Sequence, residues 1–227
     1  MVGIKSGVLR KLIIAIVALV LLLVAYVTWC YAGAVASVQT DQKVIALTYD
    51  DGPNPPHTQA LLETLGRHEV KATFFLKGQN VAAFPELVSQ IAAAGHEVGN
   101  HSYHHRAMGS LDRDEMAAEV RRVNSQLNEL LGYAPRLFRP PFGIQGAGLK
   151  LALEELQMTS VLASASGLDW ELTDAREIAD KVLADVQPGG ILLLHDGHGD
   201  IDQPHAQDCR AASVAATEII IEQLAGQ

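Results

Sequence analysis

The pattern of apolar and polar residues begins with one long uncharged segment. Residues 12–36 hold no charged side chain, whereas the residues before them include Lys5, Arg10 and Lys11 and no acid. As a helix, this segment would extend roughly 37 Å, enough to cross a hydrocarbon core of about 30 Å. Because basic flanks of membrane segments tend to stay in the cytoplasm, we expect the rest of the chain to lie on the outer side.

A cleaved signal peptide is the alternative interpretation of this segment. Residues 34–36, Ala-Val-Ala, have the small-x-small pattern of a cleavage site. The apolar stretch is longer than the roughly 7–15 residues usual in signal peptides, which favours a retained anchor. We therefore expect residues 1–36 to be a cytoplasmic flank and single-pass anchor in the cell membrane. With cleavage at about Ala36, the protein would be secreted instead.

Beyond a short segment at 37–42, which we expect to be a linker, the pattern alternates between two kinds of element. Apolar runs of strand length occupy 43–49, 71–77, 97–99, 136–138, 159–165 and 190–194. Helical patterns lie between and after them, near 56–67, 80–94, 113–131, 147–157, 174–186 and 210–224. Such alternation is typical of βα units around a parallel sheet. The length of the chain after the apolar segment suits one domain, so we expect residues 43–227 to form one α/β domain. Six units in one domain favour barrel-like closure over an open sheet.

Composition narrows the function classes. The chain after the apolar segment carries 14 basic and 26 acidic residues, a net charge of −12 with histidine neutral. Such a domain should avoid nucleic acid and anionic lipid, so we expect no nucleic-acid partner. Cys30 lies in the apolar segment and Cys209 far outside it, so we expect neither an intramolecular disulfide nor a cysteine-rich zinc site.

Polar clusters follow five of the six predicted strands. The carboxyl ends of parallel barrel strands meet at one rim, where catalytic residues of such folds gather. The clusters are Asp50 with Asp51, residues 101–105, residues 139–143, Asp169 with Trp170, and His195 with Asp196. We therefore expect one site on this rim.

Two histidines and the acidic pair have the residue types of a metal site. His101 and His105 are four apart, a spacing that puts both imidazoles on one side of a helical turn. With one carboxylate they suit Zn²⁺ or a similar divalent ion, such as Co²⁺, with a position left for water. In an extended strand Asp50 and Asp51 would point to opposite faces, so the following Gly-Pro turn must redirect one of them. If Asp51 binds the metal, Asp50 is free to act as a base on the water that the metal activates.

The motifs together resemble the polysaccharide deacetylase family. They are TYDDGPN at 48–54, HSYHH at 101–105, RPPFG at 139–143, LDW at 168–170 and LLLHDG at 192–197. This is the NodB-homology group of carbohydrate esterases (family 4), which includes peptidoglycan and chitin-oligosaccharide deacetylases. The resemblance covers about residues 42–224 and implies a distorted (β/α) barrel.

The resemblance also implies roles for individual residues. Asp50 would be the general base, and Arg139 would orient it. Asp51, His101 and His105 would bind the metal.

Other residues of the motifs would act on the substrate. His195 would be the general acid that protonates the departing amine, a step that the chemistry needs because an amine anion is a poor leaving group. Three groups would contact the substrate: the backbone N–H of Phe142 at the oxyanion, and the side chains of Trp170 and Leu193 in the sugar groove.

Two departures from the family pattern affect these expectations. Ser166 stands where the family often has the first acid of D-x-x-D-W, so Asp169 and Asp196 are both candidates for supporting His195. Related chains commonly continue into another strand after the last helix, so we expect this barrel to lack its closing strand. We expect the His-rich residues 198–208 to form a rim loop over the site.

The sequence therefore predicts a membrane-anchored, metal-dependent hydrolase that removes N-acetyl groups from amino sugars. Its substrate would be an extracytoplasmic polysaccharide, either cell-wall peptidoglycan or a chitin-like oligosaccharide. Two alternatives keep the same site, namely an O-acetyl esterase acting on a xylan-type polymer and a lipid-linked sugar deacylase. A third alternative is an inactive, carbohydrate-binding relative.

Overall fold

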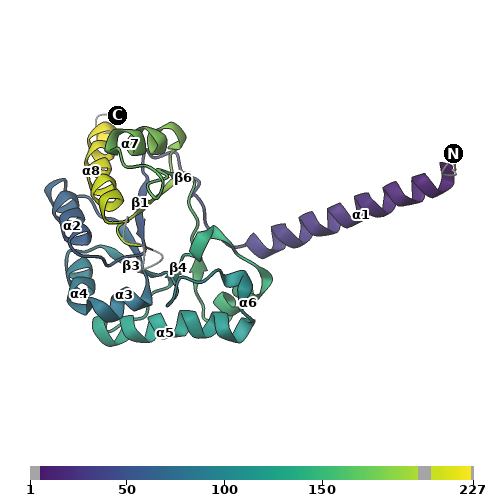
Figure 1. The fold of residues 1–227 in the computed structure, drawn as a ribbon, viewed down its shortest axis with the longest axis horizontal. Helices are drawn as coiled ribbons and strands as arrows, with labels where there is room; N and C mark the ends of the chain where they lie inside the picture. The colour runs from purple at the N-terminus through teal and green to yellow at the C-terminus, as the bar shows by residue number, and fades with distance from the viewer. Residues whose placement is uncertain (1–5, 199–205, 226–227) are drawn as a thin grey trace.

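The computed structural model describes residues 6–198 and 206–225 and contains one curled parallel sheet (Figure 1). Its seven strands lie in the order β5-β4-β3-β2-β1-β7-β6. Their bounds are β1 Ala46–Asp50, β2 Thr73–Leu76, β3 Glu97–Asn100, β4 Leu137–Phe138, β5 Thr159–Ser160, β6 Ala165–Ser166 and β7 Ile191–His195. The expected α/β architecture, a curled sheet of parallel strands alternating with helices, is confirmed.

Helices cover the outer face of the curled sheet, and one further helix projects from it (Figure 1). They are α1 Ser6–Tyr31, α2 His57–Arg67, α3 Gly78–Ala83, α4 Pro85–Ala93, α5 Arg113–Leu131, α6 Ala147–Glu155, α7 Ala175–Asp185 and α8 Ala206–Ala225. Two short 3₁₀ turns lie at Met108–Ser110 and Pro141–Gly143. These helices agree with the predicted pattern except at 80–94, where Phe84 and Pro85 divide the predicted helix into α3 and α4. Proline has no N–H to donate and therefore starts a new helix.

The termini of α5 follow directly from its sequence. The Asp112 side chain accepts from the Glu115 N–H while the Glu115 side chain accepts from the Asp112 N–H, which is a capping box. Gly132 ends the helix with φ 79°, a left-handed conformation that glycine adopts without steric cost.

The strand predicted at 159–165 is wrong in extent, because the run crosses from one sheet edge to the other. The Val161 N–H still donates to Phe138 O of β4, whereas the Ser164 N–H donates to Ile191 O of β7. The hydrophobic run is therefore two short strands, β5 and β6, on opposite edges. Periodicity cannot reveal such a crossing, since the sequence TSVLASA at 159–165 has no glycine, proline or charged residue between the two halves.

The main core lies between the sheet and its helices. Its fully buried members include Tyr49, Phe74, Leu65, Ile91 and Leu192. Burying such side chains contributes roughly 1.5–3 kcal/mol each. A smaller cluster of Phe75, Val161 and Ile191 fills the inside of the curl, and Val35 packs against it.

Residues just after α1 are bonded to the sheet. The Val35 N–H donates to Ser160 O at 2.9 Å, and Val35 O accepts from the Leu162 N–H at 2.8 Å. The Val38 N–H donates to Gly189 O at 2.9 Å. Gly189 has φ 77°, and a side chain there would collide with the Val38 carbonyl. The segment from residue 35 to residue 38 is therefore held along the domain.

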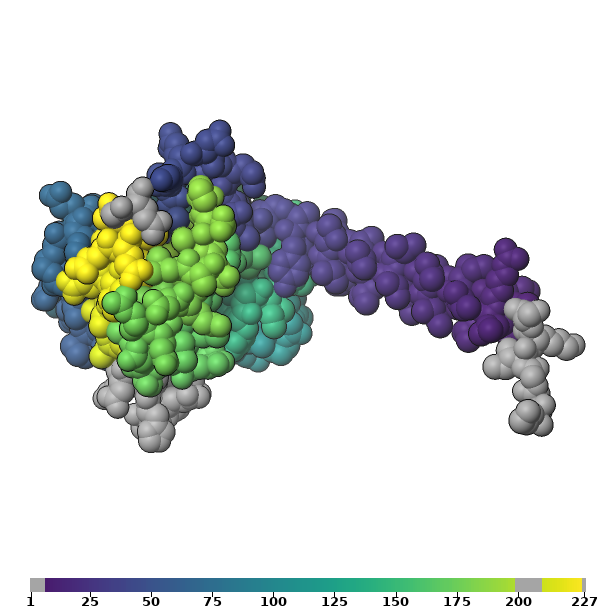
Figure 2. Space-filling view, turned by 90° about the horizontal axis from the view of Figure 1, so that it is seen from above, coloured from purple at the N-terminus to yellow at the C-terminus, as the bar shows by residue number. Residues whose placement is uncertain are grey.

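The helix α1 stands away from the domain over most of its length, as Figure 2 shows. Within Gly7–Tyr31 the most apolar 18-residue window has a mean hydropathy of 2.9, and none of that window is buried. By length and composition this helix could cross a membrane, a test that signal sequences also meet. Its last residues differ, because Cys30 is buried against the domain.

Candidate active site

The two adjacent aspartates end β1 in different backbone conformations. Asp50 is the last residue of the strand, and Asp51 has φ 72°, in the left-handed region. This conformation breaks the strand alternation, so the two carboxylates no longer point to opposite faces. The Asn80 side chain donates to Asp51 O at 2.7 Å and holds the turn. The expected redirection therefore occurs at Asp51 itself, directly before the Gly-Pro turn.

The loop after β3 carries His101 and His105, but not as a helical turn. Ser102 and His105 have φ values of 63° and 57°, which no right-handed helix contains. Asn100 Oδ1 accepts from the Ser102 N–H at 2.8 Å, and Ser102 Oγ accepts from the His105 N–H at 3.1 Å. These local bonds, rather than the helical spacing that we expected, bring the imidazoles together.

Asp51, His101 and His105 converge on one point. Asp51 Oδ1 lies 3.5 Å from His101 Nε2 and 3.3 Å from His105 Nε2. This oxygen is buried and has no hydrogen-bond partner among the described residues. His101 Nδ1 lies 2.8 Å from Arg139 O, which fixes the ring with Nε2 toward the carboxylate.

The same three residues fit a divalent metal ion. Their candidate ligand atoms all lie within 4.8 Å of one another. Burial lowers the pKa of His101 to about 3, and burial also lowers the pKa of His105, although the Asp51 charge opposes both shifts. Both imidazoles are therefore neutral at pH 7 and offer lone pairs. Two neutral imidazoles and one carboxylate form a ligand set that suits zinc, with a coordination position left open.

Asp50 is held by an arginine. Arg139 Nη1 donates to Asp50 Oδ1 at 2.7 Å and to Thr48 Oγ1 at 2.6 Å, and all three side chains are buried. The guanidinium carbon also lies 4.2 Å from the centre of the Phe75 ring. Arg139 therefore fixes the position of the Asp50 carboxylate and keeps its charge paired.

His195 is held by Asp169. The His195 Nδ1 atom lies 2.8 Å from Asp169 Oδ1, and the His195 N–H donates to Asp169 Oδ2 at 2.8 Å. Asp196 instead accepts from Thr58 Oγ1 at 2.6 Å. Of the two acids that the sequence left open, Asp169 is the one that contacts the imidazole.

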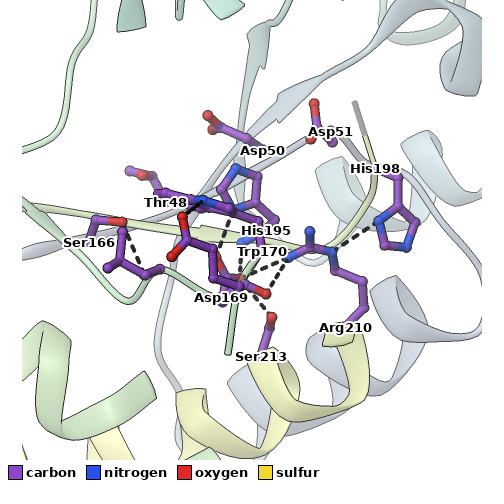
Figure 3. Close-up of polar contacts among 12 residues, drawn as sticks. Thr48, Asp50, Asp51, Ser166, Asp169, Trp170, His195, His198, Arg210 and Ser213 are labelled. Carbon is purple, nitrogen blue, oxygen red and sulfur yellow. Dashed lines mark hydrogen bonds and ion pairs between the residues drawn. The ribbon is translucent and has the colours of Figure 1, made fainter. Parts of the chain in front are cut away.

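The helix α8 supplies two residues that the sequence analysis did not single out. Arg210 Nη1 and Ser213 Oγ donate to Asp169 Oδ2 at 3.1 Å and 2.6 Å (Figure 3). The two are three apart on a helix and therefore lie on one face. In the sequence, the signal for these two residues was a basic and a hydroxyl side chain three positions apart in the last predicted helix.

The pKa values of His195 and Asp169 are shifted in opposite directions. Burial lowers the pKa of His195, but the charge of Asp169 and its hydrogen bond outweigh burial, so the pKa is raised. Burial raises the pKa of Asp169, but His195, Arg210 and Ser213 together lower it. The arrangement therefore favours a protonated imidazole beside an ionised carboxylate.

The predicted substrate contacts lie beside these groups. Phe142 has φ 61°, and its ring centre lies 4.8 Å from that of His105. The Trp170 ring is partly exposed and meets His195 edge-on at 5.4 Å. Leu193 is half-buried in β7. The rim loop predicted at 198–208 is wrong at its end, because residues 206–208 belong to α8. Residues 199–205 of that segment lie outside the described residues.

Comparison with known proteins places the chain in a family. A family model for polysaccharide deacetylase matches residues 37–161. The chain belongs to the polysaccharide deacetylase family. The resemblance deduced from the motifs is thereby confirmed.

Two curated members of the polysaccharide deacetylase family illustrate the similarity. A peptidoglycan-N-acetylglucosamine deacetylase of Bacillus cereus is 40% identical over 181 residues, or 79% of this chain and 62% of the relative. A chitooligosaccharide deacetylase of a Bradyrhizobium species is 34% identical over 183 residues, or 79% of this chain and 84% of the relative. The chain thus spans less than two thirds of the Bacillus protein.

Solved structures of polysaccharide deacetylases have the same fold. A peptidoglycan N-acetylglucosamine deacetylase in complex with a naphthalenyl N-hydroxybenzamide aligns with a TM-score of 0.79 and 36% identity, covering 88% of this chain and 91% of that chain. A Bacillus anthracis pseudoenzyme of the family aligns with a TM-score of 0.75 and 26% identity, covering 85% of this chain and 64% of that chain. Because the fold serves both kinds of protein, any argument for catalysis must come from the side chains.

Proposed function

We propose that this protein is a metal-dependent hydrolase that removes N-acetyl groups from amino sugars of an extracytoplasmic polysaccharide. One observation carries the proposal. Asp51 Oδ1, which has no hydrogen-bond partner within the described part of the chain, lies 3.5 Å from His101 Nε2 and 3.3 Å from His105 Nε2. The relatives that are named as peptidoglycan and chitooligosaccharide deacetylases give the substrate class.

Asp51, His101 and His105 would hold the metal, and their neutral imidazoles suit Zn²⁺, with Co²⁺ or another divalent ion as an alternative. When bound, a divalent ion supplies a Lewis acid that polarises the amide carbonyl and makes a water molecule easier to deprotonate. The remaining steps are carried out by residues of the chain.

Asp50 acts as the general base in this proposal. Its Oδ1 atom is engaged by Arg139 at 2.7 Å, whereas Oδ2 lies 3.7 Å from His101 Nε2, too far for a hydrogen bond. Oδ2 is thus the oxygen that receives the proton of the attacking water. Arg139 is a positioning residue, because it orients the carboxylate without touching the reacting atoms.

His195 acts as the general acid. Because Nδ1 is engaged by Asp169, Nε2 carries the proton toward the substrate. Water adds its oxygen to the carbonyl carbon, the carbon–nitrogen bond breaks, and the nitrogen leaves as a free amine with the proton from His195. The other product is acetate. The raised pKa of His195 keeps that proton available near neutral pH.

Phe142, Trp170 and Leu193 bind the substrate. The backbone N–H of Phe142 donates to the developing oxyanion. The exposed Trp170 ring beside His195 offers a face for a sugar ring, and half-buried Leu193 forms the apolar floor of the groove.

The test is acetate release by the purified full-length protein, stripped with chelator and reloaded with defined metals. We expect release from N-acetylated peptidoglycan or chitin oligomers that depends on the added metal. Release only from O-acetylated xylan would move the proposal to an esterase, and release only from a lipid-linked sugar would move it to a deacylase. Glycan binding without acetate release from any of these substrates would identify an inactive relative and overturn the proposal.

We also propose that α1 is retained as a membrane anchor. Cleavage at Ala36 would remove Val35, which bonds to Ser160 and Leu162, together with the buried Cys30. In this proposal the domain begins before residue 43, and residues 37–42 are part of it rather than a free linker. Mass spectrometry of protein from intact membranes tests this. A mature N-terminus near residue 37 would contradict it.

A further inference from the structure

The end of α1 is bonded to the loop that borders the candidate metal triad. The Tyr31 hydroxyl donates to Gly143 O at 3.4 Å and accepts from the Gln145 N–H at 3.1 Å. The buried Gln145 side chain donates to Cys30 O at 2.7 Å. Three hydrogen bonds thus connect the last turn of the apolar helix to the loop 141–145.

Aromatic and basic side chains surround this connection. Lys150 of α6 donates to Ala32 O at 3.2 Å, and its Nζ lies 5.6 Å from the centre of the Trp29 ring. The Trp29 and Tyr26 rings contact each other at 6.5 Å and are both partly exposed. Trp and Tyr near the end of a membrane helix typically lie at the level of the lipid headgroups.

The length of α1 places the loop 141–145 at the level of the outer lipid headgroups. From Lys11 to Tyr31, α1 rises about 30 Å, which matches the thickness of a hydrocarbon core. With Lys11 at the inner boundary, Tyr31 reaches the outer boundary. Residues hydrogen-bonded to Tyr31 then lie within the headgroup layer, which adds roughly 5–7 Å on each side.

The loop also has side chains suited to that layer. Phe142 is 64% exposed and Ile144 is 52% exposed, although both are large and apolar. A lipid surface is the partner that these residues fit, because the same loop is fixed to a helix of membrane-spanning length and to its aromatic end.

We propose that the loop 141–145, held by Tyr31, rests on the outer lipid surface, with Ile144 in the headgroup layer. Because the Phe142 ring contacts the His105 ring at 4.8 Å, the candidate metal triad then lies one aromatic side chain from the membrane. If the proposed function holds, this membrane contact assigns the substrate as acetylated glycan next to the membrane, rather than polysaccharide far from it. Tyr31 is a positioning residue that acts through the loop.

Depth-dependent quenching tests the contact without relying on activity. Cys30 and Cys209 are replaced by alanine in the full-length chain, and Ile144→Cys is labelled with an environment-sensitive fluorophore. The protein is placed in nanodiscs of the zwitterionic lipids phosphatidylcholine and phosphatidylethanolamine that contain headgroup nitroxide lipids. Trp29→Cys serves as the interfacial reference. The matched control is Ser89→Cys, an exposed site on α4, which lies across the domain from α1 (Figure 1).

We expect the label at 144 to be quenched as strongly as the label at 29, and the label at 89 to be unaffected. Quenching at 29 but not at 144 would overturn the proposal, and so would failure of the protein to enter the nanodiscs. If the background chain fails to fold, bilayer photocrosslinking from a benzoylphenylalanine at 144, with 89 as control, makes the same comparison. An inactive protein with a quenched 144 label would overturn the proposed function but keep the membrane contact.

Discussion

Asp50 and His195 are register partners on the adjacent parallel strands β1 and β7. The backbones of such neighbours lie about 4.8 Å apart across the sheet, near enough for a carboxylate and an imidazole to pair with each other. Each is instead held by its own partner, Asp50 by Arg139 at 2.7 Å and His195 by Asp169 at 2.8 Å. The proposed base and the proposed acid are thus side by side in the sheet and kept in separate ion pairs.

Replacing the proposed acid should separate catalysis from metal binding. For His195→Gln we expect turnover to fall about 10²–10⁴-fold, the usual contribution of a positioned general acid, with metal content unchanged. Turnover is measured with acetylated oligomers, and metal content by elemental analysis. Arg136→Gln, at an exposed position just before β4, is the control and should leave both unchanged. Loss of metal in His195→Gln would show that the imidazole is a ligand.

Removing a proposed ligand should abolish stabilisation by the metal. A bound ligand raises Tm because it binds only the folded state, so chelator should lower the Tm of the wild type. For Asp51→Ala we expect no change in Tm on adding chelator or metal. Asp180→Ala, which removes an exposed acid on α7, should respond like the wild type. An undiminished metal response in Asp51→Ala would exclude this triad as the binding site.

The buried pair of Asp50 and Arg139 should be costly to break. For Arg139→Met we expect the free energy of unfolding, measured by denaturant titration, to be about 3–5 kcal/mol lower. The reason is that Asp50 is left as an unpaired buried charge. Adding Asp50→Asn should recover part of that loss. The exposed Arg136→Met is the control and should change stability by less than about 0.5 kcal/mol. Strictly additive losses in the double variant would mean that the two side chains do not interact.

Asp169 should set the proton affinity of His195. Removing its charge with Asp169→Asn should lower the pKa of His195, so the alkaline limb of kcat/KM should move to lower pH. A pKa raised by folding stabilises the protein fully below the unfolded value of about 6.5, and this stabilisation is lost as pH rises through the folded pKa. The difference in stability between the wild type and the variant should therefore be largest at acidic pH. NMR titration of His195 checks the shift, with Asp180→Asn as control, and an unmoved pKa would contradict the prediction.

Residues 32–38 should contribute to the stability of the domain. A chain shortened to begin at residue 43 loses the backbone bonds of Val35 and Val38, at about 1 kcal/mol each. We expect its free energy of unfolding to be about 3 kcal/mol lower than that of a chain beginning at residue 32. Denaturant titration of both chains measures the difference. Equal stabilities would make this segment a linker after all.

Local patterns in the sequence predict much of this protein. Periodicity places most of the helices and strands, and the cap of α5 follows from Asp112 and Glu115 alone. The parallel alternation of strands and helices also predicts that the polar clusters share one rim, because parallel strands end on the same side. The family follows from the same motifs.

Only the tertiary structure decides which groups meet. It splits the run at 159–165 between two sheet edges, and it places Asp51 in the left-handed conformation that redirects its carboxylate. It also selects Asp169 over Asp196 as the partner of His195, and it brings in Arg210 and Ser213 from α8. The physical reason is that sequence periodicity records the burial of one face of an element, whereas a hydrogen bond depends on distances between side chains of elements far apart in the chain.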